Sequence, residues 1–188
     1  MKVVGISGSN VGTKTRIAMD YVKKVIKEKY PEAEWQLLDL AEYEMVFSDG
    51  RNYWEYEGDT KAIAETIMAA DAIIIGTPTF QASIPATLKN VFDLLPVNAF
   101  RDKVVSMIGT AGTAKHYLMM EQQLKPILGY MKAHIVPTYV FIEEKDFYRK
   151  EIINPDILFR IERLVEDTIM LVDAYAAIRQ QKDAEYGF

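Results

Sequence analysis

The sequence contains no cysteine, and its only histidines are His116 and His134. The absence of cysteine excludes disulfides, thiolate-bound metals and cysteine nucleophiles. Because the two histidines lie far apart in sequence, a zinc site would have to recruit carboxylates as well, and we expect no metal centre. We interpret His134 as structural and His116 as a residue that caps a helix or meets a neighbouring subunit.

The chain also lacks a surplus of basic residues, since 22 Lys and Arg stand against 27 Asp and Glu for a formal net charge of −5. This balance disfavours nonspecific binding to nucleic acid or anionic lipid. No apolar run reaches membrane-spanning length, and the N-terminus enters a strand pattern without the features of a secretory signal. With 49% apolar and 26% charged residues among 188, we expect one globular, cytoplasmic domain over residues 1–188.

Five strand patterns alternate with five helix patterns along the chain. Strands are expected at 3–6, 35–40, 71–78, 103–109 and 133–142, and helices at 16–30, 61–69, 86–95, 116–131 and 155–180. Pro126 should kink or divide the fourth helix, and Pro137 indicates an edge position for the fifth strand. The residues from 182 onward are expected to be loose. The alternation predicts an α/β three-layer sandwich, in which helices cover both faces of a five-stranded parallel sheet.

Ligands of such sheets bind beyond the carboxyl ends of the strands. This rule selects three loops, at 7–15, 77–83 and 109–113, which become neighbours in the strand order 2-1-3-4-5. All three are small-residue or polar loops, apart from Val11. We expect the first loop to hold a phosphate and the other two to flank a planar ring.

The first loop joins a strand to a helix, an arrangement that forms an anion site. The unpaired amides of a first helical turn and the helix dipole favour negative charge. The spacing of the glycines at 5, 8 and 12 matches neither the ATP/GTP loop nor the dinucleotide fingerprint. A mononucleotide such as FMN, with one terminal phosphate, fits better. The alternative is that the hydroxyls of this loop only cap the helix, and both readings use the same groups.

Three sequence pieces resemble a known family: Gly5-Ile-Ser-Gly-Ser9, Gly76-Thr-Pro-Thr-Phe-Gln-Ala-Ser-Ile-Pro85 and Gly109-Thr-Ala-Gly-Thr-Ala-Lys-His116. They resemble the NADPH-dependent FMN reductases of the flavodoxin-like superfamily. The nearest branch contains the alkanesulfonate-associated FMN reductases and the azobenzene and quinone reductases. The resemblance covers most of the chain, and only 41–58 and the segment beyond about 145 lack clear matches.

The resemblance implies an FMN-dependent NAD(P)H oxidoreductase with a flavodoxin-like fold. Hydride would pass from NADPH (or NADH) to the flavin N5 and then to a small-molecule electron acceptor such as free flavin, a quinone or an azo compound. No side-chain acid or base is obligatory, so no catalytic residue is expected. A homodimer or homotetramer is implied, built on the helices after the third and fourth strands. The implied cofactor-binding residues are Ser7, Ser9, Thr13, Lys14, Thr15, Pro78, Thr79, Phe80, Gln81, Gly109, Thr110, Ala111, Gly112 and Thr113.

Three departures from the family pattern affect this interpretation. Many relatives carry an arginine where this loop has Asn10 and Val11, so Lys14 or Arg16 is expected to supply that charge. Ala86 replaces a usual glycine. The stretch 121–123 lacks the tyrosine that the sulfonate-associated reductases insert in the fourth helix, which favours a retained flavin over a released one.

The alternative function is a flavodoxin-type electron carrier without NAD(P)H activity of its own. Flavodoxins usually bracket the flavin ring with aromatic residues, whereas Phe80 is the one aromatic candidate in the two ring loops. The aromatic segment 41–58 is expected to form either a lid over the ring or, more commonly, a subunit contact.

Overall fold

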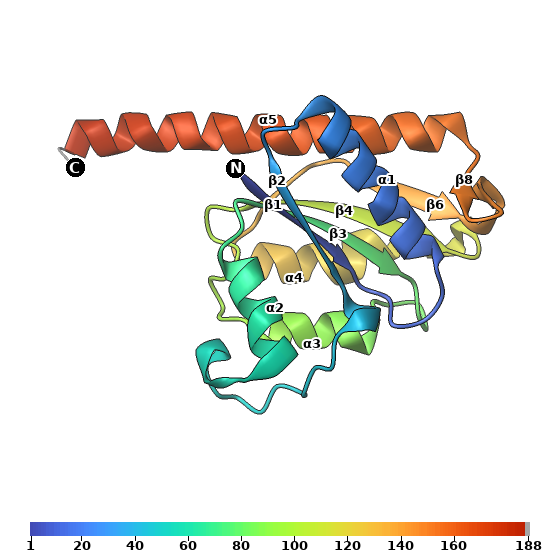
Figure 1. The fold of residues 1–188 in the computed structure, drawn as a ribbon, viewed down its shortest axis with the longest axis horizontal. Helices are drawn as coiled ribbons and strands as arrows, with labels where there is room; N and C mark the ends of the chain where they lie inside the picture. The colour runs from blue at the N-terminus through green and yellow to red at the C-terminus, as the bar shows by residue number, and fades with distance from the viewer. Residues whose placement is uncertain (187–188) are drawn as a thin grey trace.

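The computed structural model describes residues 1–186, which form a mainly parallel sheet with helices on both faces (Figure 1). The strands are β1 (Lys2–Ser7), β2 (Glu34–Asp39), β3 (Ala72–Pro78), β4 (Val104–Ala111), β5 (His134–Ile135) and β6 (Val140–Glu143). Their order is β2-β1-β3-β4-β5, with β6 also paired to β4, and all these pairs are parallel. The predicted strand order is therefore confirmed.

Five α-helices complete the three layers. They are α1 (Lys14–Lys29), α2 (Gly58–Met68), α3 (Ala86–Leu94), α4 (Lys125–Tyr130) and α5 (Pro155–Tyr186). Residues of α1 and α5 share one buried cluster with the sheet, and residues of α2, α3 and α4 share the other. Figure 1 shows these two groups on opposite sides of the strands.

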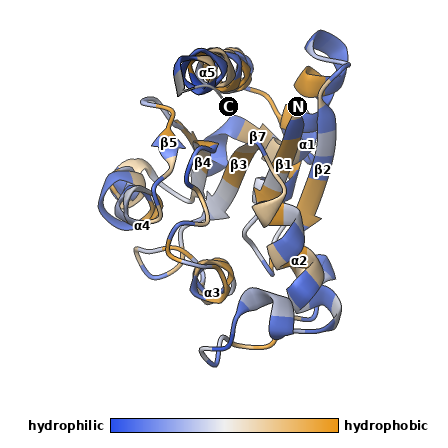
Figure 2. Cartoon of the chain, turned by 90° about the vertical axis from the view of Figure 1, so that its left-hand side faces the viewer, coloured by the Kyte–Doolittle hydropathy of each residue, from blue (hydrophilic) through white to orange (hydrophobic). Residues whose placement is uncertain are grey.

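The central strands are apolar on both faces because both faces are covered. On β3, Ile73 and Ile75 point into the cluster with α2, α3 and α4, whereas Ala72 and Ile74 point into the cluster with α1 and α5. All four side chains are fully buried. The hydropathy colouring accordingly shows orange segments along the strands and blue on the outward helix surfaces (Figure 2). This burial explains why the strand pattern at 71–78 is continuous rather than alternating.

The expected fifth strand at 133–142 is wrong as one element. The structure divides it into β5 and β6, which both pair with β4. Pro137 lies in the gap, where it cannot donate a hydrogen bond to the ladder. The edge position that this proline indicated is correct.

The helix expected at 116–131, which Pro126 was expected to kink or divide, is divided, and its helical part begins later than expected. A 3₁₀ turn at Ala114–His116 is followed by a π-helical turn at Met120–Leu124 and then by α4. The amide of Lys125 donates to the carbonyl of Met120, five residues back. Pro126 then falls in the first turn of α4, where a missing N–H has no intrahelical partner to lose.

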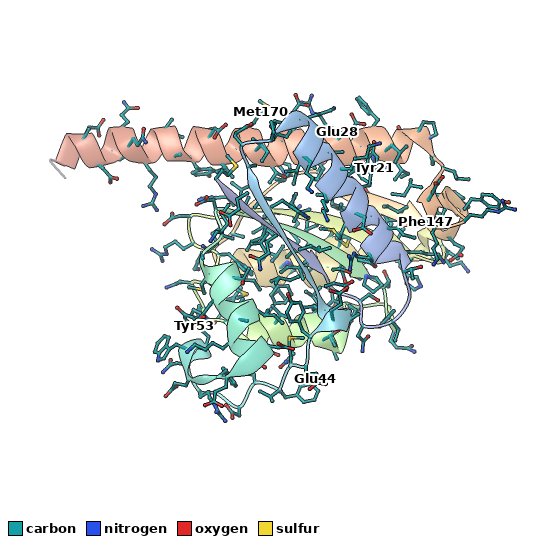
Figure 3. All side chains as sticks on the ribbon, viewed as in Figure 1. Tyr21, Glu28, Glu44, Tyr53, Phe147 and Met170 are labelled. Carbon is teal, nitrogen blue, oxygen red and sulfur yellow. The ribbon has the colours of Figure 1, made fainter. Side chains whose placement is uncertain are left out.

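The aromatic segment after β2 is ordered without regular structure. It holds two 3₁₀ turns, Leu40–Glu42 and Tyr53–Glu55. Asn90 of α3 fixes it by accepting from the Ser48 amide and donating to the Val46 carbonyl, each at 2.9 Å. Figure 3 shows this segment, marked by Glu44 and Tyr53, beside α2 and α3.

The C-terminal part of the chain contains an additional hairpin and a longer helix than expected. A two-stranded antiparallel hairpin, β7 (Phe147–Tyr148) and β8 (Glu151–Ile152), precedes α5. Helix α5 continues to Tyr186, so the tail that was expected to be loose from 182 is helical up to that residue, and the remainder lies outside the described residues. No helix within residues 1–186 combines the length and apolarity needed to cross a membrane.

Candidate functional site

The three predicted loops meet in one cleft at the carboxyl edge of the sheet. Because β1, β3 and β4 are adjacent and parallel, their carboxyl ends bring the three loops together. The cleft has a volume of about 330 Å³. Its lining residues are Ser9, Val11, Gly12, Thr13, Lys14, Thr15, Pro78, Thr79, Phe80, Thr110, Ala111, Gly112 and Glu144.

Most of the predicted site residues lie in this lining, and four do not. Ser7 is buried at the end of β1, and Gly109 lies within β4 beneath Met120. Gln81 sits in the turn beyond Phe80, and Thr113 uses its hydroxyl to accept from the Lys115 amide. The cleft itself is therefore formed by the first-loop residues from Ser9 onward, by 78–80 and by 110–112.

The start of α1 offers its amides to a ligand. Thr13 is the N-cap residue, and within residues 1–186 its side chain makes no capping hydrogen bond. The first turn of α1 contains no acidic residue. Nearby, the Ser9 hydroxyl is used inside the loop, where it donates to the Val11 carbonyl. The geometry thus favours the anion-site interpretation over simple capping, because the amides of this turn receive no side-chain oxygen from the N-cap.

The floor of the cleft is polar although it is buried. Thr15 of α1 and Thr110 of β4 share a hydrogen bond of 2.9 Å between their hydroxyls, and both residues are at most 3% exposed. The Ser7 and Thr79 hydroxyls are buried and find no hydrogen-bond partner in residues 1–186. An unpaired buried hydroxyl costs about 1–3 kcal/mol. Of these two residues, Thr79 lines the cleft and Ser7 lies beneath it, outside the lining.

Glycines give the cleft its shape. A Cβ on Gly8 would lie 3.0 Å from both the Gly76 carbonyl oxygen and Leu88 Cδ2, so a side chain there would require its neighbours to move by a few tenths of an ångström. A Cβ on Gly112 would meet no described atom within 4 Å and would project into open space. The residues present therefore fit a planar ring that lies close to the main chain at this point.

The turn at 80–83 is tight and conformationally unusual. The amides and carbonyls of Phe80 and Ser83 form two reciprocal hydrogen bonds of 2.9 Å. Between them, Gln81 and Ala82 adopt positive φ values of 48° and 61°. Non-glycine residues in this region are strained and are enriched at ligand sites. The turn holds Phe80, which is 36% exposed, at the lip of the cleft.

One charged residue of the cleft was not predicted. Glu144 follows β6 directly and forms an ion pair with Lys14, the first residue of α1. The sequence could have predicted this position, because the end of the fifth strand lies at the same sheet edge as the three predicted loops. Val11 and Gly12 also line the cleft without having been named as cofactor-binding residues.

Lys14 or Arg16 was expected to supply the positive charge of the first loop, and Arg16 does not. Its guanidinium binds Asp39 at 2.6 Å, Glu42 at 3.0 Å and Asp20 at 3.1 Å, and it is not part of the lining. The hydrogen bond that the guanidinium donates to Asp39 is the main reason that the pKa of Arg16 is raised above its usual value. Lys14 is therefore the cation of this cleft.

The comparisons with known proteins identify the family to which the chain is similar. A family model described as NADPH-dependent FMN reductase matches residues 1–147. The chain is 41% identical over 170 residues to the NAD(P)H-dependent FAD/FMN reductase of Geobacillus thermodenitrificans, which covers 90% of this chain and 92% of that protein.

Solved structures confirm the flavodoxin-like fold. An oxidoreductase from Corynebacterium diphtheriae superposes with a TM-score of 0.73 at 25% identity, covering 92% of this chain and 97% of that one. A flavodoxin from the domain Archaea superposes with a TM-score of 0.61 at 15% identity, covering 92% and 99%.

Proposed function

Because this chain belongs to the NADPH-dependent FMN reductase family, we propose that the cleft at the carboxyl edge of its sheet is the FMN site of an NAD(P)H-dependent flavin oxidoreductase. The observation that carries the assignment is the start of α1, where Thr13 makes no capping hydrogen bond within residues 1–186 and no acidic residue occupies the first turn. That turn can accept a terminal phosphate.

The cleft residues divide into two groups. The phosphate group comprises Ser9, Thr13, Lys14 and Thr15, which surround the first turn of α1. The ring group comprises 78–80 and 110–112, whose backbones are tied together by a hydrogen bond of 2.9 Å from the Thr79 amide to the Thr110 carbonyl. When bound, FMN supplies the redox chemistry, accepting hydride from NAD(P)H and delivering electrons to a small acceptor. The side chains bind and orient the flavin, and no acid or base among them is needed for proton transfer.

The open side of the cleft supports a hydride donor rather than a pure electron carrier. Phe80 is the one aromatic residue in the lining, and Gly112 leaves the opposite wall without a side chain. A flavin held there keeps a face accessible for a nicotinamide. Free flavin, quinones and azo compounds, as planar electron acceptors, suit the same face.

The test is an anaerobic titration followed by visible absorption. FMN is added to the purified protein, and one equivalent of NADPH, or of NADH in a parallel sample, follows. We expect a bound oxidised-flavin spectrum that bleaches on addition of the nicotinamide. Bound FMN that neither nucleotide bleaches would assign the chain to the electron carriers instead, and failure to bind FMN would refute the site.

We further propose that the chain forms homodimers or homotetramers in the cytoplasm, with α3 and α4 at the subunit contact. A groove of about 470 Å³ between these helices is lined by Phe92, Leu95 and Ile127, and its rim carries Val97 and Tyr130, which are 53% and 66% exposed. Lys89 and Asp93 also line it and form an ion pair of 2.6 Å with each other within α3, so they add no net charge to the apolar groove. Sedimentation should show an oligomer that Tyr130→Lys dissociates; a monomeric wild-type protein would contradict the proposal.

A further inference from the structure

The cleft has no net side-chain charge, although its guest is an anion. Lys14 and Glu144 are the two charged residues in the lining, and they pair with each other. Within residues 1–186, neither forms another ion pair. A phosphate monoester carries about −1.5 to −2 charges at neutral pH. A phosphate that binds here must therefore share Lys14 with a carboxylate or displace that carboxylate.

The backbone holds Glu144 in place. In the register of β6 against β4, Glu143 lies opposite Ala111, so the next residue emerges beside the ring loop. The 3₁₀ turn that follows is held by Asp146, which is 5% exposed and accepts from the Glu143 amide at 2.9 Å and from Asn154 Nδ2 at 2.8 Å. The Glu144 side chain is itself 62% exposed. It can leave Lys14 without disturbing the turn.

The Glu144 carboxylate is the anion that pairs with Lys14, the first residue of α1. The N-terminus of a helix attracts negative charge, and α1 has no acidic residue of its own in that turn. Glu144, which lies 130 residues from Lys14 in the sequence, supplies a carboxylate to Lys14 instead.

We propose that Glu144 is an affinity-limiting residue of the flavin site. Its carboxylate acts as an internal anion that competes with the flavin phosphate for Lys14, and so weakens the binding of phosphorylated flavin. The inference rests on the proposed function, since it needs FMN in the cleft. Because changes in affinity at one site act mainly through dissociation, Glu144 speeds flavin release. It thus favours exchange of the flavin, whereas the missing tyrosine at 121–123 pointed to retention.

The experiment compares flavins with and without a phosphate. Affinities of FMN and riboflavin are measured by fluorescence quenching for the wild-type protein and for Glu144→Gln. We expect the variant to bind FMN about fivefold more tightly, the upper range for one exposed charge pair, and to release it more slowly. Riboflavin lacks the phosphate, so its affinity should change by less than about twofold.

Glu162→Gln is the matched control. Glu162 forms a 2.6 Å ion pair with Lys29 at the opposite end of α1, so the variant makes the same change in net charge far from the cleft. We expect its affinity for both flavins to equal that of the wild type. Unchanged or weaker FMN binding by Glu144→Gln would overturn the inference, as would an equal gain for riboflavin. If the wild-type protein binds neither flavin, the proposed function itself fails, which is a separate outcome.

Discussion

The buried hydroxyl pair beneath the cleft allows a quantitative test of the site's architecture. Thr15 and Thr110 lie 95 residues apart and share one hydrogen bond of 2.9 Å. Replacing either threonine with valine removes the bond and leaves the other hydroxyl buried without this partner. Each single substitution should lower the free energy of unfolding by about 1–3 kcal/mol. The double substitution replaces both hydroxyls by methyl groups and should be close to neutral. The coupling energy between the two sites then equals the sum of the two single costs, which is at least about 2 kcal/mol.

The assay is urea unfolding of flavin-free protein, with thermal melting as a check. For a chain of this length, each kcal/mol should shift Tm by about 2–4 °C. The Thr15→Val and Thr110→Val proteins should melt lower than the double variant. Single costs that simply add in the double variant would refute the reasoning, because additivity means that the two hydroxyls do not interact.

Three further predictions concern the cleft, the pH dependence of stability and the sheet. Gly112→Val should abolish FMN binding but change the free energy of unfolding by less than about 0.5 kcal/mol, because a Cβ there meets no described atom within 4 Å. The control is Ala114→Val, at an exposed residue outside the lining, which should retain FMN binding in the same titration. Burial and a hydrogen bond to Glu162 raise the pKa of Tyr21 to about 12. The stabilising contribution of Tyr21 is therefore complete below pH ~10 and is lost as the pH rises towards 12. Tyr21→Phe should flatten the decline in the free energy of unfolding over this pH range, measured by urea unfolding, and an unchanged slope would contradict the prediction. Gly5→Ala would place a Cβ 2.3 Å from Trp35 Cη2 and should destabilise by about 1–3 kcal/mol or more; Trp35→Leu in the same chain should restore part of this loss, and no rescue would count against the clash.

The layered fold and the position of the cleft were predictable because they depend on local patterns. Alternating strand and helix periodicities imply parallel crossovers, and the sheet order then brings three loops to one edge. Local patterns signalled an irregularity at two prolines but not its form. Pro137 divides the edge strand, and the helix before Pro126 contains a π turn. A proline indicates that the regular backbone hydrogen bonding of a strand or helix is interrupted, but tertiary packing decides how the chain continues around it.

By itself, the sequence determined most of the strands and helices, which loops meet at the carboxyl edge of the sheet and which polar side chains those loops carry. Only the tertiary structure decided how those side chains are used. It paired Lys14 with Glu144 and Thr15 with Thr110, directed Arg16 to Asp39, and left the Thr13 side chain without a capping bond in residues 1–186. The physical reason is that periodicity is a property of neighbours along the chain. An ion pair or hydrogen bond between residues about a hundred positions apart depends on strand register and on how each helix packs against the sheet.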